Sequence, residues 1–172
     1  MKKKIVKRFE SGKYCFVCGT ENDAGLHAEF FLAKDGMVIG LASPHACHQS
    51  YPSTVHGGVS AALLDDALAR AVKSALPDCW SVTVEMTTVY KHPVPYDAPL
   101  VVTAVLTENG NKIYTSYGEI LLEDGTVAVT ATGKYFKLPE ERLAAAGADE
   151  ALLAEVSDDF PAFIEIPDRE PE

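Results

Sequence analysis

Alternating apolar and polar residues mark the middle of the chain. Over residues 80–87 the apolar positions are Trp80, Val82, Val84 and Met86, and the polar positions are Ser81, Thr83, Glu85 and Thr87. This period of two predicts a strand with one buried face and one polar face. Three strand-like runs follow at 99–109, 112–123 and 126–138. The turn sequences NGN and DG separate these three runs, so we expect consecutive antiparallel strands joined by hairpins.

Residues 57–75 have a different pattern, a nearly continuous series of Ala, Leu and Val. The pattern predicts a helix from about Gly57 to Ala75, which Pro77 ends. Before the helix, two apolar runs at 27–33 and 37–43 predict a strand pair that turns at 34–36. Residues 44–55 contain two prolines and no period, so we expect a loop. One helix against one antiparallel sheet is an α+β fold.

The chain of 172 residues fits one domain with a sizeable core. Within it we expect three segments: an irregular N-terminal segment at 1–25 that contains a CxxC motif, the folded domain at 26–138, and an acidic helical tail at 139–172. The helical pattern of the tail covers 141–156, and we expect the last dozen residues to fray.

Composition narrows the classes of function. The formal net charge of −10 argues against nucleic-acid binding, because phosphate contacts need clustered Lys and Arg, and the basic cluster MKKKIVKR lies at the terminus. No signal-peptide core follows this cluster, and no apolar run approaches the roughly 20 residues of a membrane helix. We therefore expect a cytoplasmic protein that does not bind membranes. Its four cysteines are expected to be reduced thiols or metal ligands.

Two adjacent carboxylates interrupt the apolar helix. At about 100° per residue, Asp66 shares a face with Arg70 and Lys73, which predicts an ion pair on the solvent side. Asp65 instead projects from an apolar face. The residues that share this face are Ala61, Leu68, Val72 and Leu76. Because burial of an unpaired carboxylate is costly, Asp65 is either satisfied by a buried hydroxyl or functional.

Two glycines stand where the same helix begins. Gly57 and Gly58 cost the helix roughly 1 kcal/mol each relative to Ala, which makes sense if a ligand or another chain approaches the bare backbone. A helix N-terminus also offers unpaired N–H groups to an oxygen that becomes negative during a reaction. The alternatives are a tight loop-to-helix junction at the glycines and a structural hydrogen bond for His56.

Together these residues resemble a known family. HGG followed by ALLDD, with Asp65 at the ninth residue after His56, and then SVTVEMTTVYKHPVP, resembles the hotdog-fold thioesterases of the PaaI-like branch, which hydrolyse acyl-CoA. The resemblance runs from about Cys15 to Phe136 and includes CFVCG and HQSYPSTVHGG. It implies a hotdog fold, in which a curved antiparallel sheet wraps a long helix. It also implies a homodimer or a dimer of dimers with shared active sites, and no cofactor.

The resemblance also implies roles for individual residues. Asp65 would be the general base or nucleophile, and the Gly57 N–H would polarise the thioester carbonyl, with the two groups supplied by different subunits. Thr83 matches a strand hydroxyl that orients water or the carboxylate. Related enzymes often have Asn where this chain has Ser50, so Gln49 is the substitute candidate. The site also includes His56 and Gly58.

Thioester chemistry suits so small a set of groups. A thioester carbonyl is electrophilic and a thiolate leaves well, so a carboxylate that activates water and one oxyanion donor can suffice. The phosphates of acyl-CoA need local positive charge. The candidates are Lys91, His92 and Lys112, each of which has a solvated surface charge as its alternative reading. Four aromatic residues either line an acyl pocket or belong to the core: Phe30, Tyr51, Trp80 and Tyr90.

Two alternatives stay open. Cys15 and Cys18, with Cys47 and either His45 or His48, could supply four zinc ligands. However, the sequence PHACH does not have the regular spacing of a second pair of zinc ligands, and we assign no metal site. The domain could also be a non-catalytic module that binds an acyl thioester or supports assembly. Asp65 favours the enzyme, because a pure binder has no reason to keep an acid facing an apolar groove.

Overall fold

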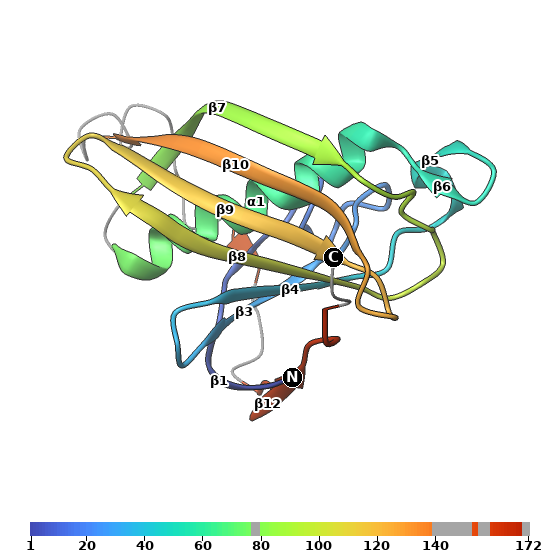
Figure 1. The fold of residues 1–172 in the computed structure, drawn as a ribbon, viewed down its shortest axis with the longest axis horizontal. Helices are drawn as coiled ribbons and strands as arrows, with labels where there is room; N and C mark the ends of the chain where they lie inside the picture. Colours follow the sequence, from blue (N-terminus) through green and yellow to red (C-terminus); the bar gives the residue numbers. More distant parts are fainter. Residues whose placement is uncertain (77–79, 139–152, 155–158, 170–172) are drawn as a thin grey trace.

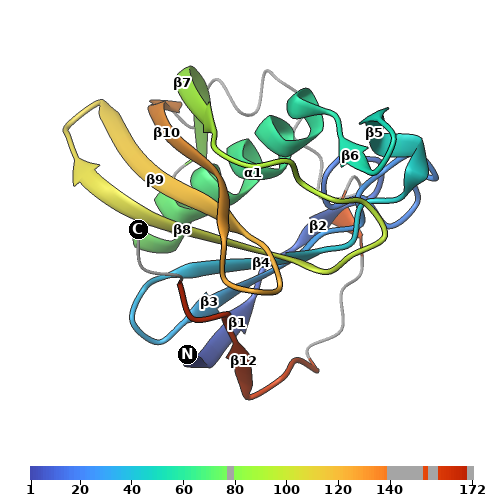
Figure 2. The same ribbon diagram turned by 45° about the vertical axis from the view of Figure 1, so that its right-hand side comes forward.

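One long helix lies across the concave face of a curved antiparallel sheet (Figures 1 and 2). The computed structural model describes residues 1–76, 80–138, 153–154 and 159–169. Helix α1 spans Gly57–Ala75, as the sequence predicts, whereas Pro77 lies outside the described residues. In this described part of the chain, no helix has both the length and the apolar character needed to cross a bilayer. The predicted α+β class is confirmed.

The sheet has eight strands in the order β12-β1-β3-β4-β8-β9-β10-β7. They are β1 (Lys2–Arg8), β3 (Glu29–Ala33), β4 (Val38–Ala42), β7 (Trp80–Tyr90), β8 (Leu100–Asn109), β9 (Ile113–Leu121), β10 (Val127–Leu138) and β12 (Phe163–Glu165). The predicted hairpins β3–β4, β8–β9 and β9–β10 are present. β7 pairs with β10 rather than with β8, the next strand along the chain, and so stands at one end of the sheet.

The loop before α1 carries short elements of its own. The helical turn η1 (Ala46–His48) leads into a small hairpin of β5 (Gln49–Tyr51) and β6 (Thr54–Val55). The His56 N–H donates to the His48 carbonyl at 2.9 Å. This hydrogen bond ties the loop to the residue from which α1 starts.

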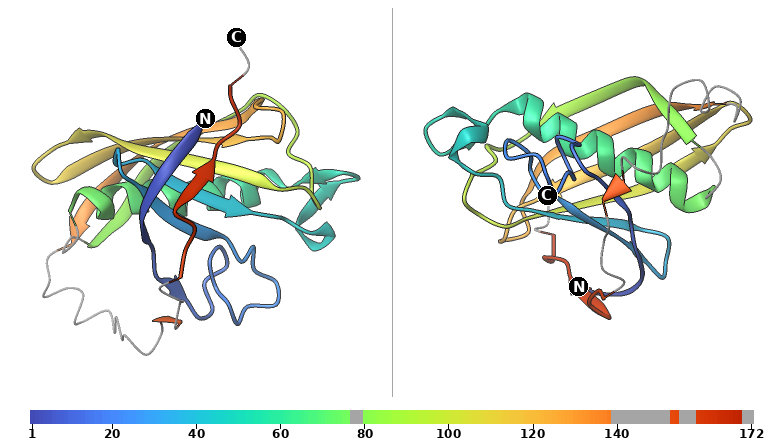
Figure 3. Two further views of the ribbon diagram at one scale, coloured as in Figure 1. Left: turned by 90° about the horizontal axis from the view of Figure 1, so that it is seen from below. Right: turned by 180° about the vertical axis from the view of Figure 1, so that it is seen from behind.

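Both ends of the chain differ from the sequence prediction. Residues 1–25 are not wholly irregular, because β1 pairs with β3 and β12 inside the large sheet. The end expected to fray contains β12. The predicted helix over 141–156 lies mostly outside the described residues, and its described part, β11 (Leu153–Ala154), pairs with β2 (Ser11–Gly12), as Figure 3 shows. The 26–138 boundaries therefore leave out strands of the sheet.

Alternation along the strands separates two apolar clusters. On the helix side, Phe30 and Ile120 join the main core with Leu64 and Leu68 of α1. On the opposite face, Phe31 and its neighbours form a second cluster with Ile5, Ile39, Leu121, Ile164 and Ile166. Strand neighbours point to opposite faces, so both faces of the central strands are buried. The strand β12 and the segment that follows it supply the cover for the second face.

A β-bulge changes which residues of β7 face the helix. Val84 falls where the register between β7 and β10 shifts, and such a shift breaks the alternation of faces. Thr83 before the bulge contacts α1, and Met86 after it packs against the main core. The strict alternation predicted that Val82 and Val84 are buried. That prediction is wrong, since these side chains are 44% and 59% exposed.

Candidate active site

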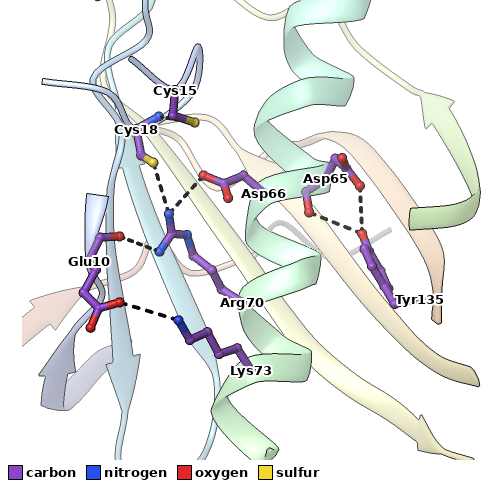
Figure 4. Close-up of polar contacts among 8 residues, drawn as sticks. All are labelled: Glu10, Cys15, Cys18, Asp65, Asp66, Arg70, Lys73 and Tyr135. Carbon is purple, nitrogen blue, oxygen red and sulfur yellow. Dashed lines mark hydrogen bonds and ion pairs between the residues drawn. The ribbon is translucent and has the colours of Figure 1, made fainter. Parts of the chain in front are cut away.

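Asp65 lies where α1 crosses β7 and β10. Its Oδ1 accepts two hydrogen bonds, from Thr83 Oγ1 at 2.9 Å and from the Tyr135 hydroxyl at 3.0 Å. Figure 4 shows Tyr135 reaching from β10 to the helix. Among the described residues, Asp65 Oδ2 accepts no hydrogen bond. Because one oxygen is held by two hydroxyls, the other is left in a defined position and able to accept a proton.

Tyr135 is a site residue that the sequence patterns do not predict. Its side chain is fully buried, and its hydroxyl also contacts the Asp65 backbone oxygen at 3.3 Å. Burial raises the pKa of Tyr135 well above its ordinary value of 10.0, and the charge and hydrogen bond of Asp65 add to the increase. Tyr135 therefore stays a neutral donor. A tyrosine in an apolar strand gives a weak signal, because the same pattern describes a core residue.

The start of α1 leaves one backbone donor available. His56 is the N-cap residue, and its Nδ1 accepts the Gly58 N–H at 3.0 Å. The Val59 and Ser60 N–H groups both donate to the His56 carbonyl. In the described structure, the Gly57 N–H has no such acceptor. His56 thus has a capping role here, and the first-turn donor that remains for a ligand belongs to Gly57 rather than to Gly58.

Tyr90, at the end of β7, covers Gly57. Its hydroxyl donates to the Gly57 carbonyl at 2.9 Å, and a Cβ added at Gly57 would lie 3.3 Å from the Tyr90 ring. A side chain larger than that of glycine would therefore press on the Tyr90 ring where the strand meets the helix, and the hydrogen bond fixes the orientation of the peptide group between Gly57 and Gly58. Tyr90 is 53% exposed, so this end of the site is open at the surface of the single chain.

The other candidates are spread over the molecule. Gln49 and Ser50 are exposed on β5, close in sequence to the helix start, and Lys91 and His92 are exposed just after β7. Lys112 directly precedes β9. Ile113 of β9 and Val82 of β7 both pair with Phe136 of β10, so Lys112 lies near the start of β7, whereas Lys91 follows the end of β7. At about 3.3 Å per strand residue, the start of β7 is on the order of 25 Å away from Lys91. Within one chain, the three basic candidates therefore do not form one cluster.

The four aromatic candidates also separate. Phe30 is buried in the main core at 2% exposure, whereas Tyr51 is 75% exposed on the β5–β6 hairpin. The side chain of Trp80 lies outside the described residues. Of the three candidates whose side chains the structure describes, Tyr90 is the one that lies at the candidate site.

Asp66 and Arg70 do not face solvent, contrary to the sequence prediction. Arg70 Nη2 lies 3.2 Å from Asp66 Oδ2 and donates to Cys18 Sγ at 3.2 Å. The Arg70 guanidinium also stacks over Phe30 at 4.5 Å from the ring centroid. The Arg70 and Asp66 side chains are only 12% and 23% exposed. The N-terminal segment covers this side of α1, which sequence periodicity alone could not reveal.

The two cysteines of the CxxC motif lie close to Asp66 on this side of α1 (Figure 4). One ligand atom from each of Cys15, Cys18 and Asp66 lies within 4.8 Å of the others. A hydrogen bond with Cys18 lowers the pKa of Cys15 to about 6, while the pKa of Cys18 is raised by the same bond and by burial. The hydrogen bond between the two free thiols therefore favours the thiolate at Cys15 and the protonated thiol at Cys18.

The zinc set considered in the sequence analysis is not assembled. Among the described residues, Cys47 and the histidines do not join the cluster of Cys15 and Cys18. His48 is buried, and both ring nitrogens are used: Nδ1 accepts the His45 N–H at 2.9 Å, and Nε2 lies 3.0 Å from the Ala24 carbonyl. His48 holds the N-terminal segment against the loop before α1, which explains its burial without a metal.

A long helix wrapped by a curved antiparallel sheet is the hotdog fold. Comparison with known proteins agrees. Residues 53–129 match the family model of the thioesterase superfamily. A crystal structure of a thioesterase superfamily protein shares 32% identity and a TM-score of 0.66, over 72% of this chain and 60% of that chain. This chain is similar to the PaaI-like hotdog proteins of that superfamily.

Two further similar proteins carry more specific names. A mutant structure of the phenylacetic acid degradation protein PaaI from Thermus thermophilus is 27% identical, with a TM-score of 0.58, over 66% of this chain and 95% of that chain. The acyl-coenzyme A thioesterase THEM4 of Bos taurus is 28% identical over 129 residues, which are 74% of this chain. The chain spans about half, 52%, of that curated relative's length.

Proposed function

We propose that the protein hydrolyses an acyl thioester, with Asp65 as the general base. Asp65 Oδ2 takes a proton from a water molecule whose oxygen attacks the carbonyl carbon. The Gly57 N–H donates to the oxygen that becomes negative, the C–S bond breaks, and the leaving thiolate takes up the proton. The free acid and the thiol are the products. A positioned base typically contributes about 10² to 10⁴ in rate.

The contacts of Asp65 carry this proposal. Asp65 is only partly buried, and its Oδ2 is not among the buried side-chain atoms that lack a partner in the described chain, so water can reach this oxygen. Here Thr83 and Tyr135 both donate to Oδ1, and in the described part of the chain Oδ2 accepts no hydrogen bond. This asymmetry suits a base whose orientation is fixed by one oxygen while the other receives the proton.

We place the complete site between two subunits. Asp65 and Gly57 are eight residues apart in one helix, which corresponds to about 12 Å along its axis at 1.5 Å per residue. One thioester carbonyl cannot contact both groups of the same chain. An Asp65 from one subunit and a Gly57 from its partner would satisfy the reaction, as in the dimers that the family resemblance implies.

The edge of the sheet supports this arrangement. β7 is the terminal strand, and exposed edges commonly pair with a second copy. If two β7 strands paired antiparallel about an axis near Met86 and Thr87, the Thr83 end of one would lie beside the Tyr90 end of the other. Thr83 contacts Asp65 and Tyr90 covers Gly57. We therefore expect a homodimer or a dimer of dimers, and a monomer at micromolar concentration in sedimentation would contradict this arrangement.

Acyl-CoA is the proposed substrate class. The experiment is a panel of acyl-CoA thioesters of different chain length, with aryl-acetyl ones included, and release of free thiol as the measurement. We expect turnover of at least one member. Saturable binding without turnover across the panel would instead support a non-catalytic module that binds acyl thioesters. The location of the protein in the cytoplasm is a separate expectation.

A further inference from the structure

We propose that Cys15, Cys18 and Asp66 bind a zinc ion, with water as the fourth ligand. The inference is independent of the proposed thioester chemistry, because it concerns the opposite side of α1. Figure 4 shows Asp65 and Asp66 projecting to different sides of the helix, Asp65 toward Tyr135 and Asp66 toward the cysteines. The helix thus presents one carboxylate to each cluster.

The donor set suits zinc in number and type. Zinc sites in proteins are tetrahedral, with Zn–S near 2.3 Å and Zn–O near 2.0–2.2 Å, which places two ligand sulfurs about 3.8 Å apart. The three donor atoms already lie within 4.8 Å of one another, so side-chain movements of about 1 Å bring them to these ligand distances. Soft thiolates favour zinc over the hard cations Mg²⁺ and Ca²⁺.

Arg70 orients two of the three ligands. Its Nη2 donates both to Cys18 Sγ and to Asp66 Oδ2 at 3.2 Å, which leaves Asp66 Oδ1 for the metal. Such hydrogen bonds from outside the coordination shell fix ligand geometry in metal sites. The charges also balance, because two thiolates and one carboxylate carry −3, while Arg70 and Zn²⁺ together carry +3.

The turn that carries the cysteines is already formed. The Cys18 N–H donates to Cys15 Sγ at 3.4 Å, and the Gly19 N–H donates to the Cys15 carbonyl at 2.8 Å. A Cβ at Gly19 would lie 2.3 Å from that carbonyl oxygen, so the turn needs a glycine at this point. The Ala28 N–H also donates a hydrogen bond to the Val17 carbonyl. A metal here would fasten this turn of the N-terminal segment to the middle of α1.

The test is a metal count on the full chain. Protein refolded with excess Zn²⁺ and a thiol reductant, then dialysed, should hold about one zinc ion per chain by elemental analysis. Cobalt(II) in place of zinc should give the thiolate charge-transfer and tetrahedral d–d absorption bands. Cys15→Ser, Cys18→Ser and Asp66→Asn should each lose most of the metal. Cys47→Ser is the matched control, since Cys47 is exposed and outside the cluster, and should keep it.

Four results would overturn the inference. Wild-type protein without stoichiometric metal, or with cobalt bands that lack the thiolate contribution, excludes the site. So does an equal metal content in the wild type and in both cysteine variants. A Cys15–Cys18 disulfide found by mass spectrometry after reductive refolding with zinc would identify the pair as a redox pair instead. The cobalt spectrum of the wild type keeps the test valid even if a variant fails to fold.

Discussion

The Tyr135 hydroxyl donates to Asp65 Oδ1 at 3.0 Å from a fully buried side chain. Thr83 donates to the same oxygen from the neighbouring strand. The two hydroxyls come from β10 and β7, which are paired so that Tyr135 lies opposite Thr83. The pairing of two strands therefore sets the orientation of a carboxylate on the helix, and this relationship leads to the first predictions.

Tyr135→Phe removes one of the two bonds to Asp65 Oδ1 and keeps the ring in the core. A hydrogen bond to a charged group is worth about 1.5–3 kcal/mol, so we expect kcat to fall roughly 10- to 100-fold with KM little changed. Thr83→Val should have a smaller effect in the same direction. Because both hydroxyls act on one oxygen, the double variant should be non-additive in a double-mutant cycle. Additive losses would show that they act separately.

Tyr135 should also make the protein sensitive to alkali. The native pKa of this tyrosine is raised, mainly by burial, so the folded chain keeps the proton at a pH where the unfolded chain releases it. The contribution of protonated Tyr135 to the free energy of unfolding is complete below about pH 10, which is the ordinary pKa of tyrosine. This contribution is lost as the pH rises further. Urea unfolding from pH 8 to 11 should show a steeper alkaline loss in the wild type than in Tyr135→Phe. Tyr51→Phe, which changes an exposed ring, should behave like the wild type.

Gly57→Ala tests the helix N-terminus. The added methyl group meets the Tyr90 ring at 3.3 Å and moves either the ring or the peptide whose N–H faces the ligand. Alanine is the better helix former by about 1 kcal/mol, so the melting temperature should change little while kcat/KM falls. In other enzymes the loss of one oxyanion donor lowers kcat by about 10² to 10³. Full activity in Gly57→Ala would remove this glycine from the mechanism.

Arg70→Ala should destabilise the fold. The change removes the ion pair with Asp66, the hydrogen bond to the Glu10 carbonyl and the stacking on Phe30. Breaking a largely buried pair costs roughly 3–5 kcal/mol, whereas an exposed pair is worth about 0–1 kcal/mol. The control is Lys134→Ala, which breaks the exposed pair with Glu85. Equal denaturation midpoints for both variants would mean that the N-terminal segment contributes little to stability.

The limits of the sequence can be traced to particular residues. The helix, the hairpins and the different directions of Asp65 and Asp66 follow from local periodicity and turn chemistry, and all are present in the structure. Val82 and Val84 were assigned to the wrong face, because a bulge cannot be inferred from alternation. The predicted solvent exposure of Asp66 is also wrong, because Phe9, Glu10 and the CxxC turn cover that side of α1 through contacts distant in sequence.

Tyr135 could not be found for the same reason. It lies 70 residues from Asp65 along the chain, and only the strand order β9-β10-β7 places it under the helix. Thr83, by contrast, was identified through the family resemblance and does contact Asp65. Whether Gln49 or Ser50 takes the place of the usual asparagine stays a prediction, since both are exposed on β5 of the single chain.

The most direct test is the turnover of Asp65→Asn on the best acyl-CoA of the panel. Asparagine keeps the shape of the side chain and removes the base, so kcat should fall by about 10² to 10⁴ with the melting temperature close to that of the wild type. Asp124→Asn, an equal change in the exposed turn between β9 and β10, should keep full activity. A folded Asp65→Asn variant that retains wild-type kcat would contradict the assignment of Asp65 as the base.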